Sequence, residues 1–415
     1  MIKKAIITNS SLMLAGLILN FLFRIYLAHH ISKSDLVIYY TLLDTVTLIT
    51  MIFVGFKDTL NKTFYHCKNK ENQIYTYNTL VFIAIFIAQV IVLPIVYFEY
   101  LSSKIDIQND FILISFMFFS LSIVIYLGNI LLVHRIYKIT SISDFLKITL
   151  FIVSFFILYF SINLKLEYRY LIYALIISNI LIISLFLYYL PIDTKKLFKL
   201  NFNLYDLKQF IQNGIISSSE YFIATLILYS AIILFIDYFS VDETALFQVV
   251  AKPIYLALIS VFSFPIFRFL LPEFSKLISE NNISKILSYR KKFIKYNFLF
   301  GLVLIILGFI FVKYIIAFMF PIEYIDSQEY IKILIIAIPF ITYNSFAFSV
   351  IKGFGYFKWT LLIRTIGLSS FLIFFYIFLY LNFQSFSIIY ALLFSNISMS
   401  IASYYFERKL LKGTL

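Results

Sequence analysis

Residues 39–53 read YYTLLDTVTLITMIF, an almost unbroken apolar run with a single carboxylate, Asp44, near its middle. About 20 consecutive residues of this kind are enough to cross the hydrocarbon core of a bilayer as an α-helix. The whole chain has the same character, because 62% of its 415 residues are hydrophobic and only 13% are charged. A soluble domain needs more polar surface than this. The sequence therefore predicts an integral membrane protein.

Apolar runs of this length form twelve windows along the chain. They lie near 7–28, 36–56, 74–98, 110–133, 142–162, 169–190, 211–236, 244–271, 296–319, 329–351, 358–381 and 386–406. Because an open strand would leave backbone groups unpaired in hydrocarbon, each window is expected to form a helix. A charged segment that begins at Pro191 falls near the middle of the chain. We therefore expect an all-α membrane protein with two six-helix lobes, 1–195 and 196–415.

Basic residues are concentrated in alternate loops. Most of the 34 Lys and Arg residues lie on the side that also holds both termini, and such an excess is typical of the cytoplasmic side. Both termini are therefore expected to be cytoplasmic. The net charge of +13 then reflects topology, and no nucleic-acid partner is expected.

The loops and the metal-binding residue types argue against catalysis. All loops are too short to hold a soluble catalytic domain, so the protein is not expected to be an enzyme. The single Cys67 and the four histidines are too dispersed for a metal site with recognisable ligand spacing. No cofactor is expected.

The two halves show a weak internal repeat, in which residues 31–44 (ISKSDLVIYYTLLD) align with residues 239–252 (FSVDETALFQVVAK). The matched pairs include Ser32 with Ser240, Asp35 with Glu243, and Asp44 with Lys252. Repeats with an even number of spans are parallel and are related by a pseudo-two-fold axis along the membrane normal. The helices that carry Asp44 and Lys252 would then face each other across a central cavity.

Charged residues inside the windows are the candidates for that cavity. A charge in hydrocarbon costs at least about 2.5 to 3.5 kcal/mol on insertion scales, so such residues usually face a bundle interior or an aqueous cavity. The deep or half-deep bases are Arg24, Lys252, Arg268 and Arg364, and the acids are Asp44 and Glu220. Lys147 and Lys332 lie near window ends, where a long side chain can reach the interface. The cavity is therefore expected to be net cationic and to suit an anionic group such as phosphate.

Two roles are open for each acid. Arg24 lies in the outer third of its window and could pair with Asp44. Such a pair would either neutralise itself and join two helices, or leave Asp44 to balance the cavity and titrate during transport. Glu220 is either a proton or cation site, or the partner of Arg268 or Arg364.

Two segments carry a resemblance to a known family. The segment ALFQVVAKPIYLALISVFSFPIFRFLLPEFSKL (245–277) resembles helix eight of the bacterial polysaccharide flippases, in which a Y-x-x-A-x-K start leads to an L-x-P-x-x-S-K-L end. These are O-antigen or capsule repeat-unit transporters of the multidrug/oligosaccharidyl-lipid/polysaccharide exporter superfamily. Residues 8–40 are similar to the family's first two helices, although the family's Gly near Leu36 or Val37 is missing.

The resemblance implies a fold and a substrate. The fold would be a V-shaped bundle of two lobes in the bacterial cytoplasmic (inner) membrane. The substrate would be undecaprenyl-diphosphate-linked oligosaccharide, carried to the outer leaflet by alternating access for assembly of surface polysaccharide, either lipopolysaccharide O-antigen or capsule. Arg24, Lys252, Arg268 and Arg364 match the bases that would hold the diphosphate.

The same resemblance implies partners. A gradient of H⁺ or Na⁺ is the expected driving force, with Asp44 or Glu220 carrying the ion. Besides the lipid bilayer and the lipid-linked oligosaccharide, a polysaccharide polymerase and a chain-length protein would be partners.

Other functions remain alternatives. A cation-coupled multidrug exporter of the same fold should have an acid-rich cavity, whereas bases predominate here. A peptidoglycan-precursor flippase usually has two further spans. A membrane glycan polymerase or glycosyltransferase needs a large outer loop or clustered catalytic acids, and the sequence shows neither.

Overall fold

The structure is a computed structural model, and some residues lie outside what it describes. These are residues 1, 58, 61–69, 106, 108–109, 135, 163–166, 191–198 and 414–415. Side chains are also not described for 2–14, for 264–269 and for a few other helical positions. Every regular element among the described residues is a helix, and eleven helices are long and apolar enough to cross a membrane. The remaining predicted window lies in α1 (Ile2–His30), which begins within the stretch of undescribed side chains.

Packing divides the chain into two compact units, Met1–Phe222 and Ile223–Leu415. The helix α11 (Leu204–Tyr238) runs through this boundary. The lobe boundary that the sequence suggested, between residues 195 and 196, lies outside the described residues. The first half of α11 packs with the first unit, for a reason given below.

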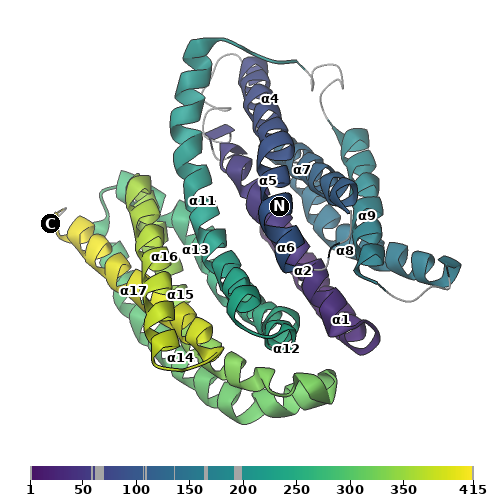
Figure 1. Cartoon of the computed structure of the whole chain (residues 1–415). Helices are drawn as coiled ribbons and strands as arrows, with labels where there is room; N and C mark the ends of the chain where they lie inside the picture. Colours follow the sequence, from purple (N-terminus) through teal and green to yellow (C-terminus); the bar gives the residue numbers. More distant parts are fainter. Residues whose placement is uncertain are drawn as a thin grey trace. The chain divides into compact units, whose positions relative to one another are not determined.

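The first unit is built around α2. Its main helices are α1, α2 (Lys33–Val54), α4 (Lys70–Ile87), α7 (Phe111–Val133), α8 (Tyr137–Ile162) and α9 (Tyr168–Tyr189) (Figure 1). The helix that begins with α4 continues to Lys104 through two π-helical stretches, η1 (Ala88–Val92) and η2 (Val96–Leu101), and the short helices α5 (Leu93–Ile95) and α6 (Ser102–Lys104). Most residues of α2 are buried, and this helix packs against α4, α7 and α9. Asp44 therefore lies on the most buried helix of the unit, where its own side chain is half-buried.

Aromatic rings join α1 to α8 beside this helix. Phe23 packs edge-on against Phe151 and Phe155, with ring centroids 5.4 and 5.3 Å apart. Edge-to-face pairs at this separation add to the stabilisation that comes from buried area. The abundant phenylalanines therefore contribute to helix packing here.

Two glycines allow α2 and α11 to approach closely. A Cβ atom at Gly55 would lie 2.1 Å from the backbone nitrogen of Ser218, and a Cβ at Gly214 would lie 2.2 Å from the Phe56 ring. At Gly55 the obstacle is backbone, so no larger side chain fits unless the helices separate, whereas at Gly214 the Phe56 ring would have to move. This contact explains why the first half of α11 belongs to the first unit.

The second unit is built around α15. Its helices are α12 (Val241–Ala245), the π-helical η3 (Leu246–Ala251), α13 (Lys252–Ser279), α14 (Ile283–Met319), the 3-10 turn η4 (Ile322–Tyr324), α15 (Ser327–Gly353), α16 (Phe357–Tyr380) and α17 (Phe386–Gly413) (Figure 1). α15 packs against α13, α14 and α17, and α16 pairs with α17 along its length.

α14 is longer than a bilayer is thick. Its 37 residues extend about 55 Å at about 1.5 Å per residue, whereas the hydrocarbon core measures about 30 Å. Its first turns carry exposed Lys291 and Lys292. One end of α14 therefore extends past the hydrocarbon, and in the predicted topology this end is cytoplasmic.

The internal repeat is visible in the helix starts. α2 begins at Lys33 and α12 at Val241, which the alignment pairs. Ser32 caps α2 by accepting a hydrogen bond from the Asp35 amide at 3.2 Å, and Ser240 caps α12 in the same way with Glu243. Both serines satisfy backbone N–H groups that a helix start leaves free. Asp44 and Lys252 lie equally far along the chain from these two caps.

Candidate functional site

The first cluster of candidate residues joins α1 and α2 at Tyr40. The guanidinium carbon of Arg24 lies 4.5 Å from the centre of the Tyr40 ring, where a cation is attracted to an aromatic face. Tyr40 is 4% exposed, and among the described residues its hydroxyl has no hydrogen-bond partner. Arg24 and Asp44 both act electrostatically on this hydroxyl. The structure therefore brings the predicted base and the predicted acid to the same tyrosine.

Asp44 lies one turn beyond Tyr40 and is half-buried. The neighbouring Thr41 and Thr45 are buried, and the Thr45 hydroxyl donates to the Thr41 carbonyl at 2.8 Å. The Thr45 hydroxyl is therefore satisfied within its own helix. The contact shown for Arg24 is the Tyr40 ring, and a direct pair between Arg24 and Asp44 remains a prediction.

Glu220 lies on α11 beside the close contact with α2. It is 9% exposed and follows Ser218, whose backbone meets Gly55. Next to Glu220 in the chain, Tyr221 meets Lys57, whose ammonium lies 5.3 Å from the centre of the Tyr221 ring. Glu220 is thus a submerged carboxylate of the first unit, and its pairing with Arg268 or Arg364 remains a prediction.

Lys252 is a buried base of the second unit. It is 8% exposed and follows directly on the π-helical stretch Leu246–Ala251, in which Gln248 is 1% exposed. A π-helical turn widens the helix and frequently occurs at functional sites. An ammonium group at this depth in a span is costly and usually functional.

Arg364 lies on α16 among aromatic and sulfur contacts. Its guanidinium carbon is 4.7 Å from the Phe348 ring centre, and its Nη1 lies 3.9 Å from the Met399 sulfur. It also acts electrostatically on the hydroxyl of buried Tyr255, which accepts a hydrogen bond of 3.1 Å from Asn396. Tyr255 lies one turn after Lys252 on α13, so both predicted bases lie near this tyrosine.

Arg268, the fourth predicted base, belongs to α13 but lies outside the residues whose side chains are described. The two predicted arginines whose side chains are described follow one pattern. In the first unit Arg24 rests on Tyr40, and in the second Arg364 rests on Phe348 near Tyr255. Aromatic faces and hydroxyls stabilise a guanidinium where water is scarce.

One charged cluster was missed from the sequence. Arg290 Nε of α14 lies 3.1 Å from Glu407 Oε2 of α17, and the Tyr343 hydroxyl of α15 donates to the same oxygen at 2.6 Å. Glu407 is 0% exposed, but it follows directly on the last predicted window, which ended at residue 406. The regular spacing of Ser400, Ser403 and Glu407 along one helix face could have revealed it.

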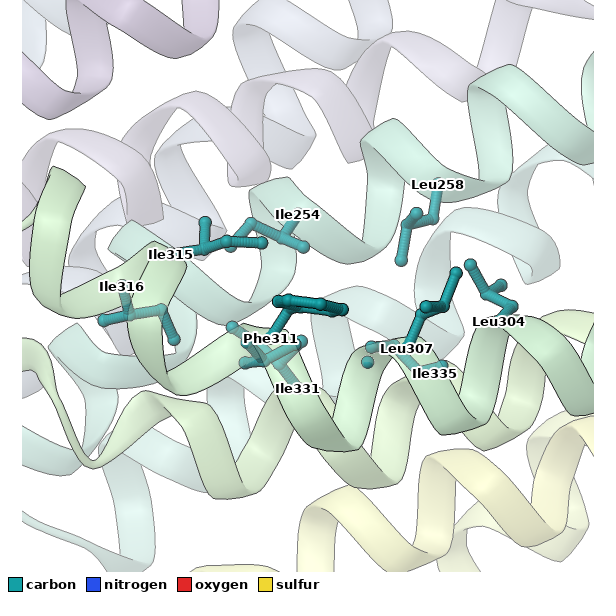
Figure 2. A pocket seen from close by; sticks show the side chains of 11 residues that line it. Ile254, Leu258, Leu304, Leu307, Phe311, Ile315, Ile316, Ile331 and Ile335 are labelled. Carbon is teal, nitrogen blue, oxygen red and sulfur yellow. The ribbon is translucent and has the colours of Figure 1, made fainter.

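A separate pocket in the second unit has a volume of about 350 Å³. It lies between α13, α14 and α15, and Figure 2 shows side chains such as Leu258, Phe311 and Ile335 around it. All eleven lining residues are apolar or glycine. Such a pocket excludes charged groups, so it is not where an anion would bind.

Comparison with solved structures identifies the fold. One, described as the inward-facing conformation of a multidrug resistance MATE family transporter of the MOP superfamily, has a TM-score of 0.79. The match has 14% identity over 96% of this chain and 95% of that one. The chain has the fold of these transporters. MOP is the exporter superfamily that the sequence resembles.

Two other solved structures are similar to this chain over almost its whole length. The outward-facing conformation of a MATE family transporter has a TM-score of 0.71 at 15% identity, over 99% of this chain and 96% of that one. A MOP superfamily transporter from Pyrococcus furiosus, described as having a binding pocket of reverse polarity that suggests a different function, has a TM-score of 0.70 at 15% identity over the same shares. No family model and no curated protein matches the sequence. At these identities the likeness shows the fold, and the finer assignment to polysaccharide flippases is taken up below.

Proposed function

We propose that this protein is a transporter that moves undecaprenyl-diphosphate-linked oligosaccharide to the outer leaflet by alternating access. The observation that supports this most strongly is the set of bases held within apolar spans, Arg24, Lys252 and Arg364. They outnumber Asp44 and Glu220, and the third buried acid, Glu407, is already paired with another base, Arg290. Bases in a poorly hydrated site bind a diphosphate strongly, because the charge–charge attraction is weakly screened there.

The surroundings of these bases suit such a substrate. The guanidinium groups of Arg24 and Arg364 rest on aromatic rings, and a guanidinium is the side-chain group that matches phosphate geometry best. Arg268 would be a fourth diphosphate-binding base. The apolar pocket of the second unit is of a kind that accepts a hydrocarbon chain, since a dry apolar cavity of about 150 Å³ already binds benzene.

An ion gradient would drive this transport. Asp44 is the first candidate for the coupling site, because it and Arg24 both act electrostatically on Tyr40, and Glu220 is the second. Moving one charge across the membrane yields about 2.3 kcal/mol per 100 mV. Either H⁺ or Na⁺ would serve, and an Asp44 carboxylate that loses its ion would be stabilised by Arg24.

The proposal includes a location and partners. The protein would lie in a bacterial cytoplasmic membrane with both termini in the cytoplasm, and would have no catalytic activity of its own. A polysaccharide polymerase and a chain-length protein would take over the repeat units after transport.

A cation-coupled multidrug exporter is the second candidate, and one observation favours it. The structure with the highest TM-score quoted above is described as a multidrug resistance transporter. The polarity of the binding pocket differs within this fold, as the description of the Pyrococcus furiosus transporter states. The bases near Tyr40 and Tyr255 are the reason we place this candidate second.

Deletion of the gene distinguishes the two candidates. We would measure surface polysaccharide by gel, the lipid-linked repeat unit retained on the inner leaflet, and sensitivity to toxic organic cations. Loss of surface glycan with accumulation of the inner-leaflet precursor is the expected result. Normal glycan with increased sensitivity to cations would refute the flippase and support the exporter.

A further inference from the structure

The Glu407 cluster contains a carboxylate that the proposed mechanism does not use. Glu407 is 0% exposed, and its Oε2 is held by Arg290 at 3.1 Å and by the Tyr343 hydroxyl at 2.6 Å. Its other oxygen, Oε1, is buried without a hydrogen-bond partner among the described residues, and so is Nη2 of Arg290. Arg290 Nε lies at ion-pair distance from Oε2 but does not form a hydrogen bond with it. Buried polar atoms of native proteins are normally paired, so these three atoms in one cluster call for an explanation.

The surroundings of Glu407 can be followed helix by helix. Among the described residues, the groups that act electrostatically on it are Tyr343 of α15 and Arg290 of α14. On α16, Arg364 contacts Met399, two turns before Glu407 on α17. On α17 itself, Arg408 lies 5.9 Å from the Tyr404 ring. Arg290 is therefore the one cation in this part of the chain that contacts the carboxylate directly.

Arg290 lies between the carboxylate and the exterior. Its side chain is 19% exposed, whereas that of Glu407 is fully buried. It lies near the start of α14, where the helix extends past the hydrocarbon. It has a second partner on α17, because its guanidinium carbon is 5.1 Å from the Tyr404 ring. The contacts of Arg290 with Glu407 and Tyr404 therefore both join α14 to α17.

We propose that Glu407 is a proton-binding site of the second unit, and that protonation releases Arg290 and separates α14 from α17. The carboxylate takes one proton from water that reaches it past Arg290, and becomes a neutral acid. The pair then changes from neutral to a single positive charge. A guanidinium that is half-buried between packed helices and has lost its carboxylate partner is disfavoured, so Arg290 moves toward water and its helix moves with it.

This inference concerns the driving ion and assumes only that the protein is a transporter, whatever its substrate. A purely structural ion pair is the competing explanation. It predicts that Glu407 stays ionised over the whole pH range in which the protein is folded. The two explanations therefore differ in a measurement that needs no substrate.

The test is infrared difference spectroscopy of the purified full-length protein in nanodiscs, during acidification. Wild-type protein is expected to gain a carbonyl band from a protonated carboxylic acid, and Glu407→Gln to lose that band. Glu329→Gln is the matched control, because Glu329 forms an ion pair of 2.6 Å with Lys332 on the same unit but is 48% exposed. Persistence of the same band in Glu407→Gln would overturn the proposal.

The helix movement is tested separately. Spin labels at Lys291 of α14 and Tyr405 of α17, in a Cys67→Ser background, are expected to move apart on acidification, and to stop responding when Glu407→Gln is added. If Glu407→Gln does not fold, Arg290→Gln with Glu407→Gln leaves no unbalanced charge in the cluster. A pH-dependent band or distance that survives in this double variant refutes the proposal, whereas the flippase function would be untouched.

Discussion

Replacement of Gly55 by alanine tests how the helix carrying Asp44 is held against the helix carrying Glu220. The φ angle of Gly55 is −68°, which any residue adopts, so only space excludes a side chain. The added Cβ would lie 2.1 Å from Ser218 N and 2.5 Å from the backbone carbon of Ser217. Favourable contacts between heavy atoms need about 3.5 to 4.0 Å. α2 and α11 must therefore separate by more than about 1 Å.

The expected cost follows from that separation. Overpacking a well-packed interior costs about 1–3 kcal/mol, and backbone atoms cannot rotate aside as a side chain can. For a unit of about 150–250 residues, 1 kcal/mol corresponds to about 2–4 °C in melting temperature. We therefore expect Gly55→Ala to lower the melting temperature of purified protein by about 2–12 °C.

Gly128→Ala is the matched control for this prediction. A Cβ at Gly128 would meet the Phe186 ring at 3.5 Å, an ordinary contact. Alanine is also the better helix former, by about 1 kcal/mol. Gly128→Ala should therefore unfold at or slightly above the wild-type temperature. Equal melting temperatures for Gly55→Ala and Gly128→Ala would refute the close approach of α2 and α11.

Three further predictions concern the charged residues and the helix caps. Arg24→Glu should abolish transport of the lipid-linked repeat unit while the protein inserts at normal levels, because the charge offered to a diphosphate is reversed. Full activity of this variant would contradict a role of Arg24 in the cavity. Arg24→Lys is the control that keeps the charge. Asp44→Asn should change the pH or sodium dependence of transport in vesicles, and an unchanged dependence would leave Asp44 with a structural role only. Ser240→Ala should lower the stability by about 1 kcal/mol through loss of the helix cap, as measured by thermal unfolding. Ser284→Ala, at an exposed position, should lower the stability less.

Hydropathy alone predicted where the helices lie. All twelve windows fall on helices, including the long α14 and the interrupted helix from Lys70 to Lys104. This succeeds because hydrocarbon leaves a chain no way to satisfy its backbone other than intrahelical hydrogen bonds. The aligned caps Ser32 and Ser240 were visible in the sequence for a similar reason, since capping is a local interaction between residues three apart.

The ends of the apolar windows were predicted less accurately than their positions. The error at the end of the last window concealed the buried carboxylate Glu407. The last window stopped at residue 406, whereas α17 continues to Gly413. Hydropathy falls where the charged residues Glu407, Arg408 and Lys409 begin, so the sequence suggests that the membrane ends there. Glu407 is nevertheless fully buried, because α14 and α15 supply Arg290 and Tyr343 from elsewhere in the chain.

The sequence by itself determined that this protein lies in a lipid bilayer, where its helices run, and which charged residues they carry. Only the tertiary structure decided which groups meet. It placed Arg24 on the face of Tyr40, Arg364 on Phe348, and Arg290 against Glu407. The physical reason is that hydropathy and capping act within a few residues, whereas an ion pair or a cation on a ring depends on helix rotation and packing. These are set by contacts between residues far apart in the chain, such as Gly55 against Ser218.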